Sequence, residues 1–141
     1  MFLSILLICF TIKHRPSTPV PRGYGLKSQM KKVYKSRNDI TAKLFSDGIT
    51  KQKSIVVTVE GSEPGTVIIG AHLDSISEAN MELMDLNTEK LAPGGDDDGS
   101  GLMVLMEALR VIVETGYKPK KTVEIHAYGA EEIGLRGPLK I

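Results

Sequence analysis

The sequence predicts a three-layer α/β fold for the larger part of this 141-residue chain. Two runs of β-branched residues, SIVVTV at 54–59 and TVIIGA at 66–71, have the composition of neighbouring strands separated by a turn-rich segment. An apolar segment at 102–115 predicts a buried helix, and TVEIHAY at 122–128 alternates like a half-buried strand. The order strand, strand, helix, strand is typical of layered α/β domains.

Composition is that of a globular protein, with 41% hydrophobic and 25% charged residues. The net charge of +1 conceals an asymmetry, because residues 1–53 carry eleven Lys or Arg against two Asp or Glu, whereas residues 54–141 carry seven against fifteen. The two parts therefore have net charges of about +9 and −8. The basic residues are scattered without interleaved aromatic residues, which argues against a nucleic-acid-binding surface.

The first segment, residues 1–12, is an apolar run with the length of a secretory signal but with no Lys or Arg before it. It is too short to span a bilayer, which takes about 20 apolar residues. An atypical secretory signal would make the protein secreted or extracellular, and an artefactual start or a fraying apolar end fits the same residues. The single cysteine, Cys9, lies in this run and cannot form a disulfide within the chain.

Residues 13–53 are expected to form a basic linker and a surface helix. Pro and Gly are dense in RPSTPVPRGYG at 15–25, which discourages regular structure. The next apolar residues recur at helical spacing among lysines: Leu26, Met30, Val33 and Tyr34. This spacing predicts a helix that packs one apolar stripe on a larger body. The ordered part is expected to begin at Ser54.

A long acidic connection runs from His72 to Gly95, and loops of this length in compact domains are usually functional. The helix that follows is expected to begin after Ser100, whose hydroxyl can cap it, and to end at Gly116. Its apolar residues occupy most of its circumference, so it should be well buried. In the last strand, His126 has the parity of Glu124 and is expected on the polar side, away from any metal.

The first candidate site residues follow the second strand. His72 comes directly after it, and Asp74 lies two residues on, on the same side of an extended chain. An imidazole can bind a metal through one nitrogen while a carboxylate holds its other N–H group. The pair therefore predicts a metal ligand and the residue that orients it, although a surface histidine beside an acid has the same pattern.

Three consecutive carboxylates, Asp96, Asp97 and Asp98, precede the buried helix. They repel one another unless cations or amide donors offset their charge, and a helix start supplies only partial positive charge. A bound divalent cation would offset it, and one carboxylate can bridge two metals about 3.5 to 4 Å apart. An exposed acidic turn that caps the helix is the alternative.

Glu131 and Glu132 come at the end of the last predicted strand. Adjacent side chains in an extended or turning backbone point to different places, so one can hold a metal while the other accepts a proton from water. A solvated acidic helix start is the alternative.

Four blocks occur in a fixed order between residues 54 and 137: TVIIGAHLDSIS, LAPGGDDDGSG, LMEALRVI and TVEIHAYGAEEIGLRG. Together they resemble the M28 metallopeptidases, the family of bacterial and fungal leucyl aminopeptidases. The resemblance implies the zinc-dependent exopeptidase fold, a three-layer α/β/α arrangement with a mixed central sheet. Residues 54–141 would be part of such a catalytic domain, incomplete at its C-terminal side.

The resemblance also implies a role for each candidate residue. His72, Asp97 and Glu132 would be ligands of two zinc ions, with Asp97 bridging them. Asp74 would orient His72, and Glu131 would be the general base that deprotonates the attacking water. The substrates would be the amino termini of peptides or proteins. Cobalt or manganese could replace zinc, because carboxylate-rich sites accept several metals.

The family supplies one further Asp and one further His from sequence beyond the Glu-Glu element. Without them each zinc would have two protein ligands, whereas a catalytic zinc normally has three. The resemblance therefore predicts a truncated chain that is inactive by itself.

Three alternatives belong to other classes. Metal-dependent carboxypeptidases and deacylases of the M20 type have GxGxxDxKG where this chain has DDDGSG, and glutaminyl cyclases share the fold with one zinc but lack the triple Asp. A peptidase-like binding module without metals is the third. The intact candidates argue against loss of the metals by substitution: His72, Asp97, Glu131 and Glu132.

Overall fold

The computed structural model describes residues 22–46, 48, 50, 52–76 and 94–141. Its long elements are the helices α2 (Arg22–Tyr34) and α4 (Gly101–Glu114) and the strands β1 (Ile40–Phe45), β2 (Ser54–Val59), β3 (Glu63–His72) and β4 (Lys121–Tyr128). An irregular turn, Gly95–Ser100, in which Asp97 and Asp98 have non-helical backbone angles, precedes α4, and a 3₁₀ turn, Pro138–Lys140, follows β4. The apolar segment 1–12 and most of the acidic connection lie outside the described residues.

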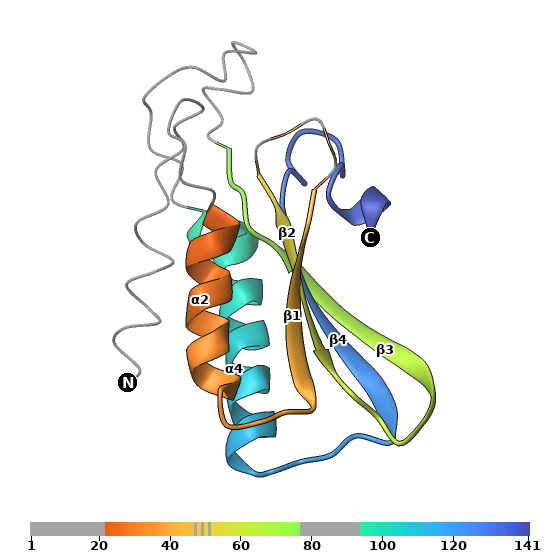
Figure 1. The fold of residues 1–141 in the computed structure, drawn as a ribbon. Helices are drawn as coiled ribbons and strands as arrows, with labels where there is room; N and C mark the ends of the chain where they lie inside the picture. Colours follow the sequence, from red (N-terminus) through yellow and green to blue (C-terminus); the bar gives the residue numbers. More distant parts are fainter. Residues whose placement is uncertain (1–21, 47, 49, 51, 77–93) are drawn as a thin grey trace.

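The strands form one mixed sheet in the order β1-β2-β4-β3 (Figure 1). The β1–β2 and β2–β4 pairs are antiparallel, and β3 runs parallel to β4. A parallel pair needs a crossover connection, which α4 provides. His72 at the end of β3 is in register with Tyr128 at the end of β4. The residues that follow the two strands therefore meet at the C-terminal ends of the strands. The predicted mixed α/β fold is confirmed.

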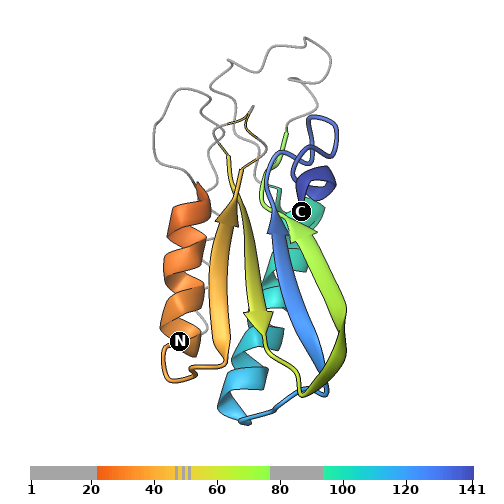
Figure 2. The same cartoon turned by 45° about the vertical axis from the view of Figure 1, so that its right-hand side comes forward.

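The helices α2 and α4 lie side by side against one face of the sheet (Figures 1 and 2). The buried residues of α4 have the spacing of a single helix face: Leu102, Leu105, Met106 and Leu109. They form a core with the inward residues of β2 and β4, among them Val57 and Ile125. The opposite side of α4 differs from the expectation of burial all round, because Val104 is 68% exposed among the described residues.

The part of the chain before Ser54 contributes more than a linker and a surface helix. Strand β1 pairs with β2 along its whole length, and its first residue, Ile40, is buried in the core. The apolar stripe predicted for α2 is confirmed, since Met30 is fully buried, but the helix begins at Arg22, within the segment predicted to be irregular. The alternation of Ile40, Ala42 and Leu44 was a strand signal, interrupted by lysine and threonine.

On the face of the sheet that no helix of the described residues covers lie the even-numbered residues of β4. The His126 ring lies between Glu124 and Tyr128 and contacts Glu124 Oε2 and the Tyr128 hydroxyl oxygen, each at 3.1 Å. His126 is on the polar side, as expected, and it is buried there by these partners.

No helix among the described residues is long and apolar enough to cross a membrane.

Candidate metal centre

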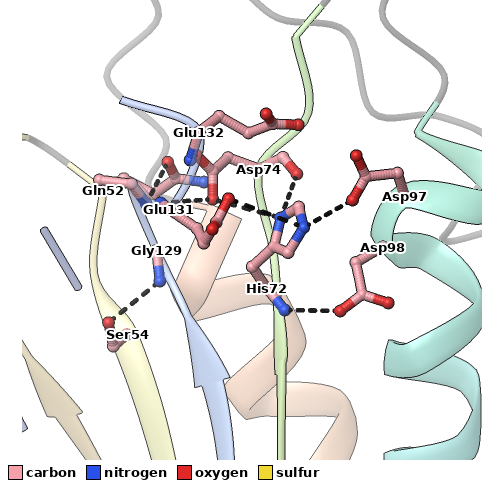
Figure 3. A network of polar contacts seen from close by, with 10 residues as sticks. Gln52, Ser54, His72, Asp74, Asp97, Asp98, Gly129, Glu131 and Glu132 are labelled. Carbon is pink, nitrogen blue, oxygen red and sulfur yellow. Dashed lines mark hydrogen bonds and ion pairs between the residues drawn. The ribbon is translucent and has the colours of Figure 1, made fainter. Parts of the chain in front are cut away.

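All five candidate site residues lie at the C-terminal ends of strands β3 and β4 (Figure 3). His72 and Asp74 come from the end of β3, and Glu131 and Glu132 follow β4. Asp97 comes from the turn before α4, and α4 then leads to the start of β4, which runs parallel to β3 and brings Glu131 and Glu132 to the same place. The parallel β3–β4 pair therefore explains why residues far apart in sequence meet here.

Three of these residues form a group that could hold a metal ion. One ligand atom each from His72, Asp97 and Glu132 lies within 4.8 Å of the other two. His72 Nε2 and Asp97 Oδ1 are 2.8 Å apart. One imidazole nitrogen and two carboxylate oxygens are the donor set that zinc accepts, and cobalt and manganese accept it as well. The residues thus fit a divalent transition metal, and they are the three that the resemblance implied as ligands.

Glu131 lies beside this group. Its Oε2 is 3.9 Å from His72 Nε2, and its side chain is partly exposed. The side chains of Glu131 and Glu132 therefore take different positions at the cluster, as expected for neighbouring residues in a turning backbone.

The orientation of the His72 ring differs from the prediction. His72 Nδ1 lies 3.0 Å from the backbone carbonyl oxygen of Asp74, whereas the nearer carboxylate oxygen of Asp74 is 3.8 Å away. A carbonyl oxygen only accepts hydrogen bonds, so Nδ1 donates to it, and in the protonated ring Nε2 donates to Asp97 Oδ1; loss of the Nε2 proton leaves the hydrogen on Nδ1 in place. Nε2 is then the nitrogen available to a metal, and the backbone of Asp74 orients the ring.

The Asp74 carboxylate holds the Glu-Glu segment. Its Oδ1 accepts a hydrogen bond from the Glu131 N–H group and its Oδ2 one from the Glu132 N–H group, each at 3.0 Å. The side chain is 7% exposed, so these two charge-assisted bonds are shielded from solvent. Both oxygens of the Asp74 carboxylate thus hold the Glu-Glu segment, and the one nearer to His72 Nδ1, at 3.8 Å, is too far away for a hydrogen bond to the ring.

The segment after β4 is also tied to the start of β2. The Gly129 N–H group donates to Ser54 Oγ at 3.0 Å, and the Ala130 N–H group donates to Gln52 Oε1 at 3.2 Å. Four consecutive N–H groups, from Gly129 to Glu132, thus have side-chain acceptors from other segments. Sequence reasoning missed Gln52 and Ser54, because neither belongs to a motif.

The electrostatics of the cluster favour positive charge. Burial alone would lower the pKa of His72, but the hydrogen bond to Asp97 and the Asp74 carbonyl raise it above the ordinary value. Burial raises the pKa of Glu132, and the Asp97 carboxylate raises it further. Both shifts mean that the site binds protons more readily than isolated side chains do, and a metal cation would take their place.

The predicted cap of α4 is corrected. The Ser100 hydroxyl donates to the backbone carbonyl of Asp96 at 2.8 Å and caps no helical N–H group. Asp98 Oδ1 accepts from the Gly101 N–H group at 3.0 Å instead. Asp98 was also missed as a partner of the site, for its Oδ2 accepts from the His72 N–H group at 3.0 Å. An acid three residues before the first helical residue was the available signal.

Residues 54–138 match the model of Peptidase family M28. The chain belongs to this family, as its sequence blocks predicted, and the match begins at the first residue of β2.

Named relatives are aminopeptidases. A probable aminopeptidase of Saccharomyces cerevisiae is 41% identical over 111 residues, which are 74% of this chain and 28% of the relative. Leucine aminopeptidase 1 of Colletotrichum graminicola is 46% identical over 91 residues, 62% of this chain and 21% of the relative. The crystal structure of the LapA aminopeptidase of Legionella pneumophila has a TM-score of 0.76 at 26% identity and covers 96% of this chain and 34% of its own. The chain thus spans between about a fifth and a third of these proteins.

Proposed function

We propose that this chain is the part of a zinc-dependent aminopeptidase that supplies His72, Asp97 and Glu132 as metal ligands and Glu131 as the general base. The observation that carries the proposal is the meeting of the three ligand atoms, within 4.8 Å of one another, from three separate segments of an M28 family member. Relatives named as aminopeptidases support the substrate class, the amino termini of peptides.

Each residue of the cluster would have a separate role in hydrolysis. When bound, zinc would make a water molecule more acidic and polarise the scissile carbonyl. Glu131 would accept the water proton at its carboxylate, which lies next to the ligand group without belonging to it. The Asp74 carbonyl would hold the His72 ring with Nε2 toward the ligands.

The described residues provide three protein ligands, the number that one catalytic zinc normally has. The two-zinc site implied by the family resemblance needs ligands from further sequence. We therefore expect this chain by itself to hold at most one zinc ion, more weakly than a complete two-zinc site would, and to hydrolyse little or no substrate. A preference for leucine at the substrate amino terminus follows the names of the relatives. Secretion stays a prediction from residues 1–12.

Zinc titration and hydrolysis of leucine p-nitroanilide test the proposal. We would compare this chain with a version that continues into the natural downstream sequence, and each with its His72→Gln variant. We expect the longer chain to bind about two zinc ions and to release nitroaniline, and His72→Gln to weaken zinc binding in both chains. Zinc affinity unchanged by His72→Gln, or no hydrolysis by the zinc-loaded longer chain, would refute the proposal.

A further inference from the structure

We propose that Asp98 is a positioning residue that holds the Asp97 ligand against His72, an inference that rests on the proposed function because it concerns the same site. Asp96 and Asp98 both lie outside the ligand group, but of the two only Asp98 has a carboxylate with a hydrogen bond to His72 among the described residues. The Asp98 carboxylate joins the end of β3, which carries the ligand His72, to the start of α4, which follows the ligand Asp97.

The Asp98 carboxylate bridges the end of β3 and the start of α4. Its Oδ2 accepts from the His72 N–H group and its Oδ1 from the Gly101 N–H group, each at 3.0 Å (Figure 3). His72 and Asp98 are 26 residues apart in the chain, so this is a tertiary contact. Because both bonds end on one planar carboxylate, they set the position of Asp98, and with it that of its neighbour Asp97, relative to the His72 ring.

The His72 N–H group does not bond to the neighbouring strand β4, and Asp98 accepts it instead. Strand β3 lies at one edge of the described sheet, next to β4. The Leu73 N–H group donates to the Tyr128 carbonyl of β4 at 2.6 Å. Successive N–H groups of a strand point in opposite directions, so the His72 N–H group points away from β4. Asp98 accepts a hydrogen bond that β4 cannot, and it does so at the metal-ligand residue itself.

The absence of a side chain at Gly101 leaves the room that the Asp98 carboxylate occupies. A Cβ atom at Gly101 would overlap the Asp98 carboxylate, with the Asp98 Cγ 2.8 Å away. The backbone of Gly101 is ordinary right-handed helix, with φ −61° and ψ −43°, so alanine fits its conformation. The obstacle to a side chain at this position is therefore the Asp98 carboxylate, and Gly101→Ala would displace that carboxylate without removing its charge.

Asp96 provides a matched control. It belongs to the same acidic run and is exposed, and its backbone carbonyl accepts the hydrogen bond from Ser100. Asp96→Asn and Asp98→Asn therefore change the net charge of the run equally. Asp98→Asn alone replaces an acceptor oxygen with an amide NH₂ group that faces one of the two N–H donors.

The test is zinc affinity of the full chain, measured by competition with a chromophoric chelator, together with the visible absorption spectrum of the cobalt-loaded protein. We expect Asp98→Asn to weaken zinc binding about 10-fold or more, as loss of a partner that orients a ligand does, and to change the cobalt absorption bands. Gly101→Ala should do the same, although alanine favours the helix more than glycine does. Asp96→Asn should stay within about 2-fold of the unaltered chain.

The outcomes separate three situations. If the unaltered chain binds zinc and both Asp98→Asn and Gly101→Ala bind it with the same affinity and cobalt spectrum, Asp98 has no positioning role and the proposed metal site stands. If these variants only lower the unfolding temperature of the metal-free chain, Asp98 is a structural helix cap. If the unaltered chain and its longer version bind no zinc, the proposed function fails and the role of Asp98 fails with it. Should Asp98→Asn not fold, Gly101→Ala decides between the first two.

Discussion

Asp74 Oδ1 accepts a hydrogen bond from the backbone N–H group of Glu131, 57 residues further along the chain, at 3.0 Å. The second oxygen of the same carboxylate accepts from Glu132, and the Asp74 carbonyl lies against His72 Nδ1. One residue therefore positions two ligands and the proposed general base, the carboxylate on one side and the backbone on the other. Because Asp74 follows β3 by two residues, the rigid sheet carries this arrangement.

Asp74→Asn is expected to destabilise the metal-free chain. The amide oxygen can accept one of the two N–H groups, but the NH₂ group would face the other, and a buried donor without an acceptor costs about 1–3 kcal/mol. Urea unfolding followed by circular dichroism measures the change in the free energy of unfolding. Asp96→Asn, an exposed change of the same charge, should stay within about 0.5 kcal/mol. Equal stability of the two variants would contradict the role given to the Asp74 carboxylate.

Glu131→Gln and Glu132→Gln are expected to have different effects in the longer, active chain. Glu131→Gln removes the proton acceptor and should lower kcat about 10²–10⁴-fold while zinc affinity changes little. Glu132→Gln removes a ligand and should weaken zinc binding. Steady-state hydrolysis of leucine p-nitroanilide and zinc titration distinguish them. Weaker zinc binding by Glu131→Gln than by Glu132→Gln would reverse the two assignments.

Zinc binding is expected to release a proton from His72. Its pKa in the metal-free chain lies above the ordinary value of 6.5, because hydrogen bonds to Asp97 and the Asp74 carbonyl outweigh the opposing effect of burial. The metal needs neutral imidazole, so zinc affinity should fall as the pH is lowered through this raised pKa. Calorimetric titration near neutral pH in two buffers with different ionisation enthalpies measures the protons released. Identical heats in both buffers would contradict the release of a proton on zinc binding.

The raised pKa of His72 also affects the stability of the metal-free chain, which should fall as the pH rises, whereas zinc affinity should rise. A raised folded-state pKa means that protonated His72 stabilises the fold, an effect fully present below pH 6.5 and lost as the pH rises through the raised value. Urea midpoints of the metal-free chain at a series of pH values, compared with those of His72→Gln, isolate this contribution. A His72-dependent gain in stability with rising pH would contradict the sign.

Leu109→Ala should test the packing of α4 on the sheet. Leu109 is fully buried in the core, and replacing a buried leucine by alanine costs about 2–5 kcal/mol. Val104→Ala on the same helix is the control, because Val104 is 68% exposed and should change the free energy of unfolding by about 0.5 kcal/mol or less. Similar losses for both variants, measured by urea unfolding, would mean that α4 packs differently.

Local patterns account for much of what could be predicted. The β-branched runs of β2 and β3 and the alternation of β4 identified these strands, since strand side chains repeat every two residues. Strand β1 was missed because its apolar alternation is short and is interrupted by one threonine and one lysine, and pairing with β2 rather than its own composition makes it a strand. The residue types at 72, 97, 131 and 132 indicate metal chemistry by their identity and by their places at the ends of strands and the start of a helix.

Residue types and their spacing were enough to predict the family, the order of the principal strands and helix of the matched region, and the residues able to bind a metal. Which atom each of these residues offers to which partner emerged only from the folded chain. It assigned the Asp74 carboxylate to Glu131 and Glu132 and the Asp74 carbonyl to His72, and it brought Asp98 to the His72 N–H group. Periodicity places a side chain on one face of an element, but the His72, Glu131 and Glu132 N–H groups that reach the Asp98 and Asp74 carboxylates come from residues 26 to 58 positions away in the chain, where no local pattern can place them.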